Sequence, residues 1–199
     1  MPLAVSSSSN NPANRPFTLA EAKQHLRVDD TAEDAYIDTL ISAVTKHVQG
    51  YIGRTLISTT YTWKLDRFPR SQNLTFPRPP LQSIASIAYI NQDGDSTTWG
   101  STYYNLDTVS HPARLEPAYS ESWPITRAQN NAVTVTYTAG YGDEAEDVPV
   151  DIRQGMLFLL GHLYENRQDV VVGTGFVTNV PKASEWLIDP YRIYAFEGY

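Results

Sequence analysis

The spacing of apolar residues changes twice along the chain, which predicts helices first, then strands, then helices again. In the first part, apolar side chains recur in steps of three and four, the period of one face of an α-helix. They are Tyr36, Ile37, Leu40, Ile41, Val44, Val48, Tyr51 and Ile52. We expect a helix of about 22 residues, roughly 33 Å long. It should begin at the carboxylates Asp30 and Glu33 and end at Gly50 and Gly53.

A shorter helix is predicted over residues 18–27, just before the long one. Thr18 and Glu21 have the spacing of a capping box, in which each side chain accepts a hydrogen bond from the other residue's backbone N–H. We therefore expect this helix to begin at Thr18 and to end near Arg27.

The middle of the chain has the period-two pattern of half-buried strands. For example, Tyr61, Trp63 and Leu65 alternate with polar residues. The predicted strands are residues 60–65, 84–90, 103–109, 114–115 and 132–138. A turn is predicted at residues 91–94, and the prolines of residues 77–80 exclude a regular element there.

Helices return after an acidic stretch at residues 143–147. Carboxylates are favoured near the start of a helix by its dipole, and Pro149 fits the first helical turn. Residues 156–164 are apolar almost all round, so they must be covered on several sides, and we expect a neighbouring subunit to supply one wall. A short helix is predicted over residues 182–188. The aromatic-rich tail that follows it is expected to dock on another surface.

Together these elements predict an α+β fold. The N- and C-terminal helices should form a small helical bundle with an inserted antiparallel β module, because each helical block needs the other to bury its apolar face. The predicted parts are a flexible leader at residues 1–16, a helical domain at 17–57 and 143–188, a β module at 58–142 and a docking tail at 189–199. The polar, serine-rich composition of the leader predicts disorder.

Composition and charge narrow the functions to consider. The 199 residues are 41% apolar and 19% charged, which is typical of a globular protein. The chain has no cysteine, which excludes disulfides, and no apolar run of about 18 residues, which argues against a membrane span. No signal peptide opens it, so we expect synthesis in the cytoplasm. A net charge of −7 disfavours binding of duplex DNA by phosphate neutralisation, although an acidic protein can surround DNA without adhering to it.

The sequence carries no recognisable catalytic motif. The four histidines are scattered along the chain, at His25, His47, His111 and His162. His162 and Glu165 have a spacing that can place two ligands on one metal, but such a pair is more often structural. Asn91, Asp93 and Asp95 resemble the start of a calcium loop, but no glutamate follows at the twelfth position. We therefore expect no enzyme, no cofactor and no metal site.

Charge is distributed unevenly along the chain, with bases gathered between residues 54 and 78 and acids between 143 and 151. The side chains in question are Arg67, Arg70 and Arg78, and Glu144, Glu146 and Asp147. Helix capping and a solvated strand face explain this pattern without a partner. The alternative is a contact between neighbouring copies, because a ring requires two different and complementary surfaces on each subunit.

Seven short segments occur in an order and spacing that resemble one family. They are FTLAEAK at 17–23, YIGR at 51–54, PRPPL at 77–81, VTYTAGYG at 135–142, VPVDIRQ at 148–154, HLYENR at 162–167 and PYR at 190–192. The chain resembles the head–tail connector (adaptor) proteins of tailed phages and gene transfer agents over about residues 17–194.

This resemblance implies a structural protein without catalytic residues. It implies a homo-oligomeric ring, a dodecamer in the particle, bound beneath the portal protein at the neck of a phage or phage-like particle. DNA would pass through the channel without sequence-specific binding, and the lower face would receive a stopper or tail-completion protein. In such adaptors the C-terminal segment often reaches the portal. The expected portal-docking residues here are Trp186, Tyr191, Arg192, Ile193, Tyr194 and Phe196.

A ligand-binding module of a virion protein is the alternative function. Trp99, Tyr103, Tyr104 and Trp123 of the β module could supply a stacking surface for a glycan. A hydrolase is a third option that no motif supports.

Overall fold

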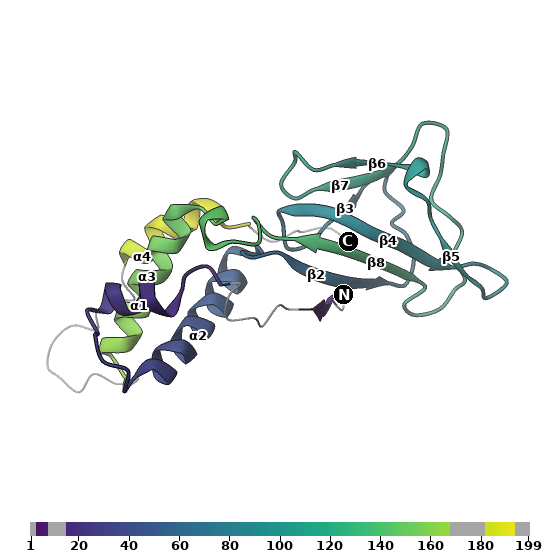
Figure 1. Cartoon of the computed structure of the whole chain (residues 1–199). Coiled ribbons are helices and arrows are strands. Elements are labelled where there is room, and N and C mark those ends of the chain that lie inside the picture. The colour runs from purple at the N-terminus through teal and green to yellow at the C-terminus, as the bar shows by residue number, and fades with distance from the viewer. Residues whose placement is uncertain (1–2, 8–14, 168–181, 194–199) are drawn as a thin grey trace, which may run out of the picture. The chain divides into compact units, whose positions relative to one another are not determined.

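The computed structural model describes residues 3–7, 15–167 and 182–193. These residues form two compact units, which Figure 1 shows as a group of helices and a group of strands. The helical unit comprises residues 15–57, 142–167 and 182–193, and the β unit comprises residues 3–7 and 58–141. The predicted α+β class is therefore confirmed.

The helical unit contains α1 (Leu19–Leu26), α2 (Asp34–Ile52), α3 (Val150–Glu165) and α4 (Lys182–Ile188). Helix α3 contacts the other three helices, so the N- and C-terminal helices pack together as predicted. The apolar face of α2 is buried at Ile37, Ile41, Val44, Val48 and Ile52. Burial of such aliphatic side chains is the main force that holds a helical bundle together.

Helix α1 begins as the sequence predicts, with both hydrogen bonds of the capping box. The backbone N–H of Glu21 donates to Oγ1 of Thr18 at 3.1 Å, and the backbone N–H of Thr18 donates to Oε2 of Glu21 at 2.7 Å. The helix closes at Arg27, whose φ of 59° lies in the left-handed region.

Helix α2 ends where predicted but begins differently. Gly53 closes it with a φ of 71°, a conformation that favours glycine, whereas Gly50 lies within the helix. The predicted start at Asp30 and Glu33 is wrong, because α2 begins at Asp34 and the Glu33 side chain makes no capping bond. Oδ1 of Asp30 accepts a hydrogen bond from the backbone of Ala32, so both carboxylates serve other contacts.

Helix α3 also begins slightly later than predicted. The acidic stretch forms a short 3-10 helix, η2 (Ala145–Asp147), and Pro149 occupies the N-cap position just before α3. Met156, Leu159 and Leu160 are buried within the chain, while Phe158 remains 37% exposed. The neighbouring subunit expected to cover this helix stays a prediction.

The β unit contains two antiparallel sheets. The larger has the order β1 (Leu3–Ser7), β2 (Thr59–Leu65), β8 (Val133–Ala139), β4 (Leu81–Ile90) and β5 (Ser96–Thr98). The smaller has the order β3 (Leu74–Thr75), β7 (Arg114–Pro117) and β6 (Tyr104–Asp107). In the larger sheet Trp63 lies opposite Val135, and both are buried, as the period-two pattern predicts.

One apolar core joins the two sheets. It includes Trp63 and Tyr137 from the larger sheet and Leu115 from the smaller, together with Phe76 between them. The Phe76 ring centroid lies 6.1 Å from that of Trp63 and 5.2 Å from that of Tyr137. Burial raises the pKa of the Tyr137 phenol, whose O–H donates to the Pro77 carbonyl at 2.9 Å.

Several strands differ from the sequence-based prediction. Residues 3–7, assigned to a flexible leader, form β1 and pair with β2, because edge pairing uses backbone groups that serine-rich composition does not reveal. The short strands β3 and β5 were not predicted. Strand β6 ends at Asp107, whose carboxylate accepts from the backbone N–H groups of Val109 and Ser110 and turns the chain.

Within the described ranges, no helix has the length and apolarity needed to cross a membrane.

Candidate interaction surfaces

The segment after α4 returns to the C-terminal end of α2 and is held there by hydrogen bonds to backbone carbonyls. The N–H of Ile193 donates to the Ile52 carbonyl at 2.9 Å, and Nε of Arg54 donates to the Tyr191 carbonyl at 2.6 Å. The second bond is charge-assisted, which makes it stronger than a neutral pair.

Side chains reinforce this attachment. The Tyr51 hydroxyl donates to Asp189, which raises the pKa of the Tyr51 phenol, and the Arg192 guanidinium lies 4.7 Å from the centre of the Tyr51 ring. The Tyr191 hydroxyl donates to Oδ2 of Asp151 at 3.1 Å. We call this set the C-terminal lock; it joins Tyr51, Arg54 and Asp151 to residues 189–193.

The predicted docking residues divide between two environments. Tyr191, Arg192 and Ile193 belong to the C-terminal lock and contact their own helical unit. Trp186 projects from α4 and is 77% exposed. Tyr194 and Phe196 lie outside the described residues.

Helix α4 is anchored against α3 by the face opposite Trp186. Ser184 and Ile188, four residues apart, are 3% and 4% exposed. They approach Gly155 so closely that a Cβ atom there would lie 2.7 Å from Cγ1 of Ile188 and 3.2 Å from the Ser184 carbonyl. Glycine at position 155 therefore permits this close packing. The outer face of α4 borders a shallow depression of about 500 Å³, lined by Ala183, Glu185, Trp186 and Asp189.

Ion pairs tie the helices to one another and to the entering chain. Arg153 of α3 donates to Oε1 of Glu21 at 2.5 Å and to the Pro16 carbonyl at 2.9 Å. Lys23 pairs with Asp34 at 2.6 Å, and Arg15 pairs with Asp38, whose carboxyl pKa this contact lowers.

Glu33 is the centre of a further contact between α2 and the end of α3. Its carboxylate accepts hydrogen bonds from the hydroxyl of Tyr164 and from the guanidinium of Arg167, and both lower its pKa. The Arg167 guanidinium lies over the rings of Tyr36 and Tyr164, at 4.7 and 5.1 Å from their centres. The sequence-based interpretation of Glu33 as a cap missed this role.

The residues predicted to form a contact between copies are mostly at the surface. Arg67 and Arg70 are exposed between β2 and β3, and neither makes an ion pair or side-chain hydrogen bond with any residue that the structure describes. Arg78 is half-buried and close enough to Tyr137 to affect its pKa, so it is a poorer candidate.

The acidic members of that predicted contact lie in and beside η2. The backbone N–H of Glu144 donates to Oδ2 of Asp147 at 3.0 Å, and together these residues form a capping box. Both are exposed, as is Glu146, which has no side-chain partner within the described part of the chain. Capping therefore explains two of the three carboxylates and leaves Glu146 unassigned.

The aromatic residues proposed to bind a glycan do not form a surface. Trp99 is 7% exposed, and its ring centroid lies 5.2 Å from that of Tyr104 and 5.3 Å from that of Trp123. Trp123 in turn stacks on Phe68 at 5.1 Å. Only Tyr103 of the proposed set is exposed, so these rings serve the core of the β unit and this prediction is wrong.

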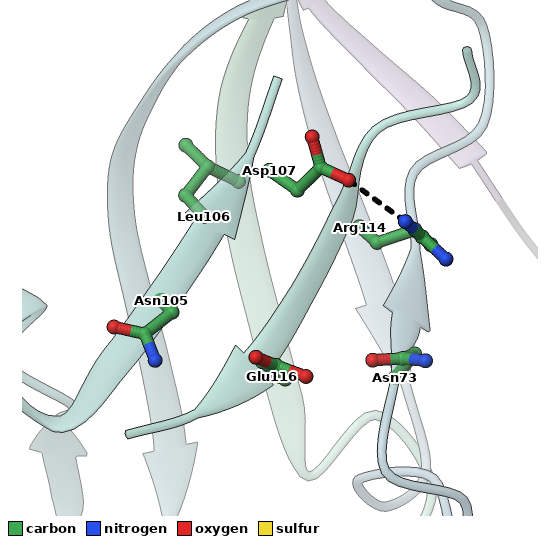
Figure 2. A pocket seen from close by; sticks show the side chains of 6 residues that line it. All are labelled: Asn73, Asn105, Leu106, Asp107, Arg114 and Glu116. Atoms are coloured by element: carbon green, nitrogen blue, oxygen red, sulfur yellow. Dashed lines mark hydrogen bonds and ion pairs between the residues drawn. The ribbon is translucent and has the colours of Figure 1, made fainter. Parts of the chain in front are cut away.

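The outer face of the smaller sheet carries a small polar pocket of about 200 Å³ (Figure 2). Asp107 and Arg114 pair across it at 2.9 Å, and Asn105 lies opposite Glu116 on the neighbouring strand. Hydrogen bonds from Ser110 and Arg114 hold the pKa of the Asp107 carboxyl well below its ordinary value. The pocket is typical of the solvated face of a sheet.

The two weak metal motifs have structural explanations. Nδ2 of Asn166 lies 3.3 Å from the ring nitrogen of His162, and no group of three metal-ligating side chains occurs among residues 3–7, 15–167 and 182–193. The predicted turn at 91–94 is confirmed, because Oδ1 of Asn91 accepts from the backbone of Gly94 and Asp95.

Comparison with known proteins identifies the family of the chain and solved structures with a similar fold. The sequence model of the head completion protein family matches residues 17–194. No curated protein sequence matches the chain.

Two similar solved structures are described as the neck of an empty gene transfer agent (GTA) particle and the virion of a native one. Each is 22% identical to this chain, with a TM-score of 0.81, and the match covers 100% of this chain and 99% of the other. A third, from the neck of the native particle, is 23% identical with a TM-score of 0.74. At this identity the likeness establishes a shared fold. The match of the family model over nearly all residues shows that the chain belongs to the head completion protein family.

Proposed function

We propose that the protein is the connector subunit of a phage or phage-like particle, and that it forms a ring at the neck between portal and tail. The single observation that carries this proposal is the match of the head completion family over residues 17–194. The shared fold with a chain of the GTA neck supports it, because that fold covers the whole length of both chains.

The proposed mechanism is mechanical rather than catalytic. The ring extends the portal channel and offers its lower face to a stopper or tail-completion protein. The acidity of the chain, with a net charge of −7, fits a lumen that DNA passes without adhering.

A complementation experiment tests the function. Filled heads from particles that lack this protein would be mixed with the purified chain and then with tails. Joined particles, counted by electron microscopy, are expected only when the protein is added. Normal joining without it would reject the proposal.

The C-terminal segment is proposed to make the portal contact. Because residues 189–193 belong to the C-terminal lock, two truncations separate docking from folding. A chain ending at Ile193 keeps the described lock, and a chain ending at Ile188 loses it. We expect both to stay folded and both to attach poorly to portal-bearing heads. Full attachment of both would show that the tail is not needed.

Neighbouring copies are proposed to meet through basic and acidic surfaces. Arg67 and Arg70 of one subunit would face the η2 carboxylates Glu144, Glu146 and Asp147 of the next, and the exposure of these side chains supports this pairing. Arg78 contributes less because it is half-buried. The double variants R67E/R70E and E144K/E146K should each fail to form rings on heads, whereas together they should form alternating rings. Normal rings from either double variant alone would place the contact elsewhere.

A further inference from the structure

Trp186 is a large aromatic side chain that is exposed to solvent although the helix that carries it is fixed in the fold. The helix that carries it is fixed on its other face by Ser184 and Ile188 against Gly155, and the C-terminal lock fixes the chain just beyond it. Trp186 is nevertheless 77% exposed. Exposed tryptophans on rigid elements are over-represented at the centres of protein interfaces, where they contribute much of the binding energy.

The charges beside Trp186 indicate what kind of group would meet it. Among the described residues, the depression next to the ring is lined by Ala183, Glu185, Trp186 and Asp189, which include two carboxylates and no cation. Glu185 is exposed and has no hydrogen bond or ion pair with a described residue. The guanidinium of Arg192, a few residues further along the chain, lies over the Tyr51 ring.

An indole ring bordered by carboxylates suits one class of side chain. A guanidinium stacks on the flat face of tryptophan and donates to a carboxylate at the same time, whereas an ammonium is a smaller, more strongly hydrated charge. Aspartate or glutamate on a partner would be repelled by Glu185 and Asp189.

We infer that the surface formed by Ala183, Glu185, Trp186 and Asp189 receives an arginine side chain of the portal protein. The guanidinium stacks on the Trp186 indole and donates hydrogen bonds to the Glu185 carboxylate. This inference rests on the proposed function and adds to it the chemistry of the partner.

Binding of the full chain to portal-bearing heads, measured over a range of protein concentrations, tests this assignment. W186A should weaken binding by about 30-fold or more, the range of an interface hot spot. E185R should weaken it by about 10-fold or more through repulsion, and E185Q by a smaller factor. E121R, which makes the same charge change at an exposed site of the β unit, is the matched control and should bind normally.

Ionic strength provides a second measurement. Raising the salt concentration should weaken binding of the unchanged chain more than binding of E185Q, because the variant lacks the screened interaction. Circular dichroism of each variant checks that the helices remain folded.

The outcomes separate this inference from the proposed function. If W186A fails to bind while E185R and E185Q bind normally, the partner group is apolar, and the arginine assignment is wrong although portal docking stands. If all variants bind as well as the unchanged chain, the docking surface lies elsewhere and the inference fails. If the unchanged chain does not bind these heads at all, the proposed function itself fails.

Discussion

The two units of the protein are stabilised in different ways. The β unit has a continuous core in which rings such as Phe76, Trp63 and Tyr137 contact one another between two sheets. The helical unit has an aliphatic core, and four of the five ion pairs among the described residues lie in it. Its separate chain segments are joined by charged contacts such as Arg153–Glu21 and Arg167–Glu33.

This difference has a consequence for function. A core of interlocking rings depends little on solution conditions, so the β unit is expected to behave as a stable body. Polar contacts at the edges of the helical unit respond to pH and substitution, and they hold the elements proposed to meet the portal. Two signals separate the units, because the α-helices of the described residues lie in one and Trp63, Trp99 and Trp123 lie in the other. Trp186 belongs to the helical unit but is already 77% exposed, so its fluorescence should change little on unfolding.

The largest effect is expected from opening the aromatic core. Phe76→Ala removes a ring that is 1% exposed, and the cavity should lower the free energy of unfolding of the β unit by about 3–5 kcal/mol. Tryptophan fluorescence should then report a much lower unfolding midpoint. The midpoint of the circular dichroism signal at 222 nm, which reports the helices, should stay unchanged. A matching fall in both midpoints would mean that the units unfold as one body.

A smaller effect is expected from crowding α3 against α4. Gly155→Ala would normally favour a helix, but the added Cβ would lie 2.7 Å from Ile188, and relieving that overlap should cost about 1–3 kcal/mol. The 222 nm midpoint should fall and the fluorescence midpoint should stay unchanged. Stabilisation by this substitution would show that α4 can move away freely. Gly50→Ala, which meets no atom within 4 Å, is the control.

A fall in pH should lower the stability of the helical unit more than that of the β unit. The pKa values of Glu33 and Asp38 are lowered in the folded state by Tyr164, Arg167 and Arg15. Their contribution to stability is therefore present above their ordinary pKa values and is lost as the pH falls through the lowered ones.

Between pH 6 and pH 3 the 222 nm midpoint should fall more than the fluorescence midpoint, since the β unit has only Asp107 paired in this way among its described carboxylates. Thermal melts across this range measure both signals. Glu33→Gln should reduce the pH dependence of the helical signal. An equal fall in both signals would contradict the comparison.

The smallest effect is expected at the C-terminal lock. Tyr51→Phe removes the hydrogen bond to Asp189 but keeps the ring under Arg192. The free energy of opening the lock should therefore fall by about 0.5–1.5 kcal/mol or less. Hydrogen exchange at the amide of Ile193, which bonds to Ile52, reports opening of the lock directly. Faster exchange there with an unchanged melt is the expected result, and unchanged exchange would show that this bond is dispensable.

Local patterns gave reliable predictions in this chain. The Thr18–Glu21 capping box, the closing Gly53 and the alternation through Trp63 were all found as predicted, because each depends on residues near in sequence. The same reasoning failed for Glu33. It has the spacing of a cap, but its carboxylate accepts hydrogen bonds from Tyr164 and Arg167 instead. A long-range contact outweighed a local preference there.

The candidate surface was only partly predictable. The sequence identified Trp186 as a docking residue, and the structure leaves it exposed. No sequence signal indicated that Arg54 and Tyr51 hold the segment after α4, since Arg54 and its partner Tyr191 are 137 residues apart. Trp99 and Trp123 were taken for a surface because composition alone does not distinguish a ring in the core from one in solvent.

By itself, the sequence determined the α+β class and most helices and strands of this protein, because the periods of apolar residues and the caps are written in neighbouring positions. It also carried the resemblance to neck proteins that the family match supports. The tertiary structure alone decided which aromatics are buried, which carboxylates are paired and how the chain after α4 is fastened to α2. Those outcomes depend on side chains from distant segments competing for the same partners, and only the folded chain brings these side chains together.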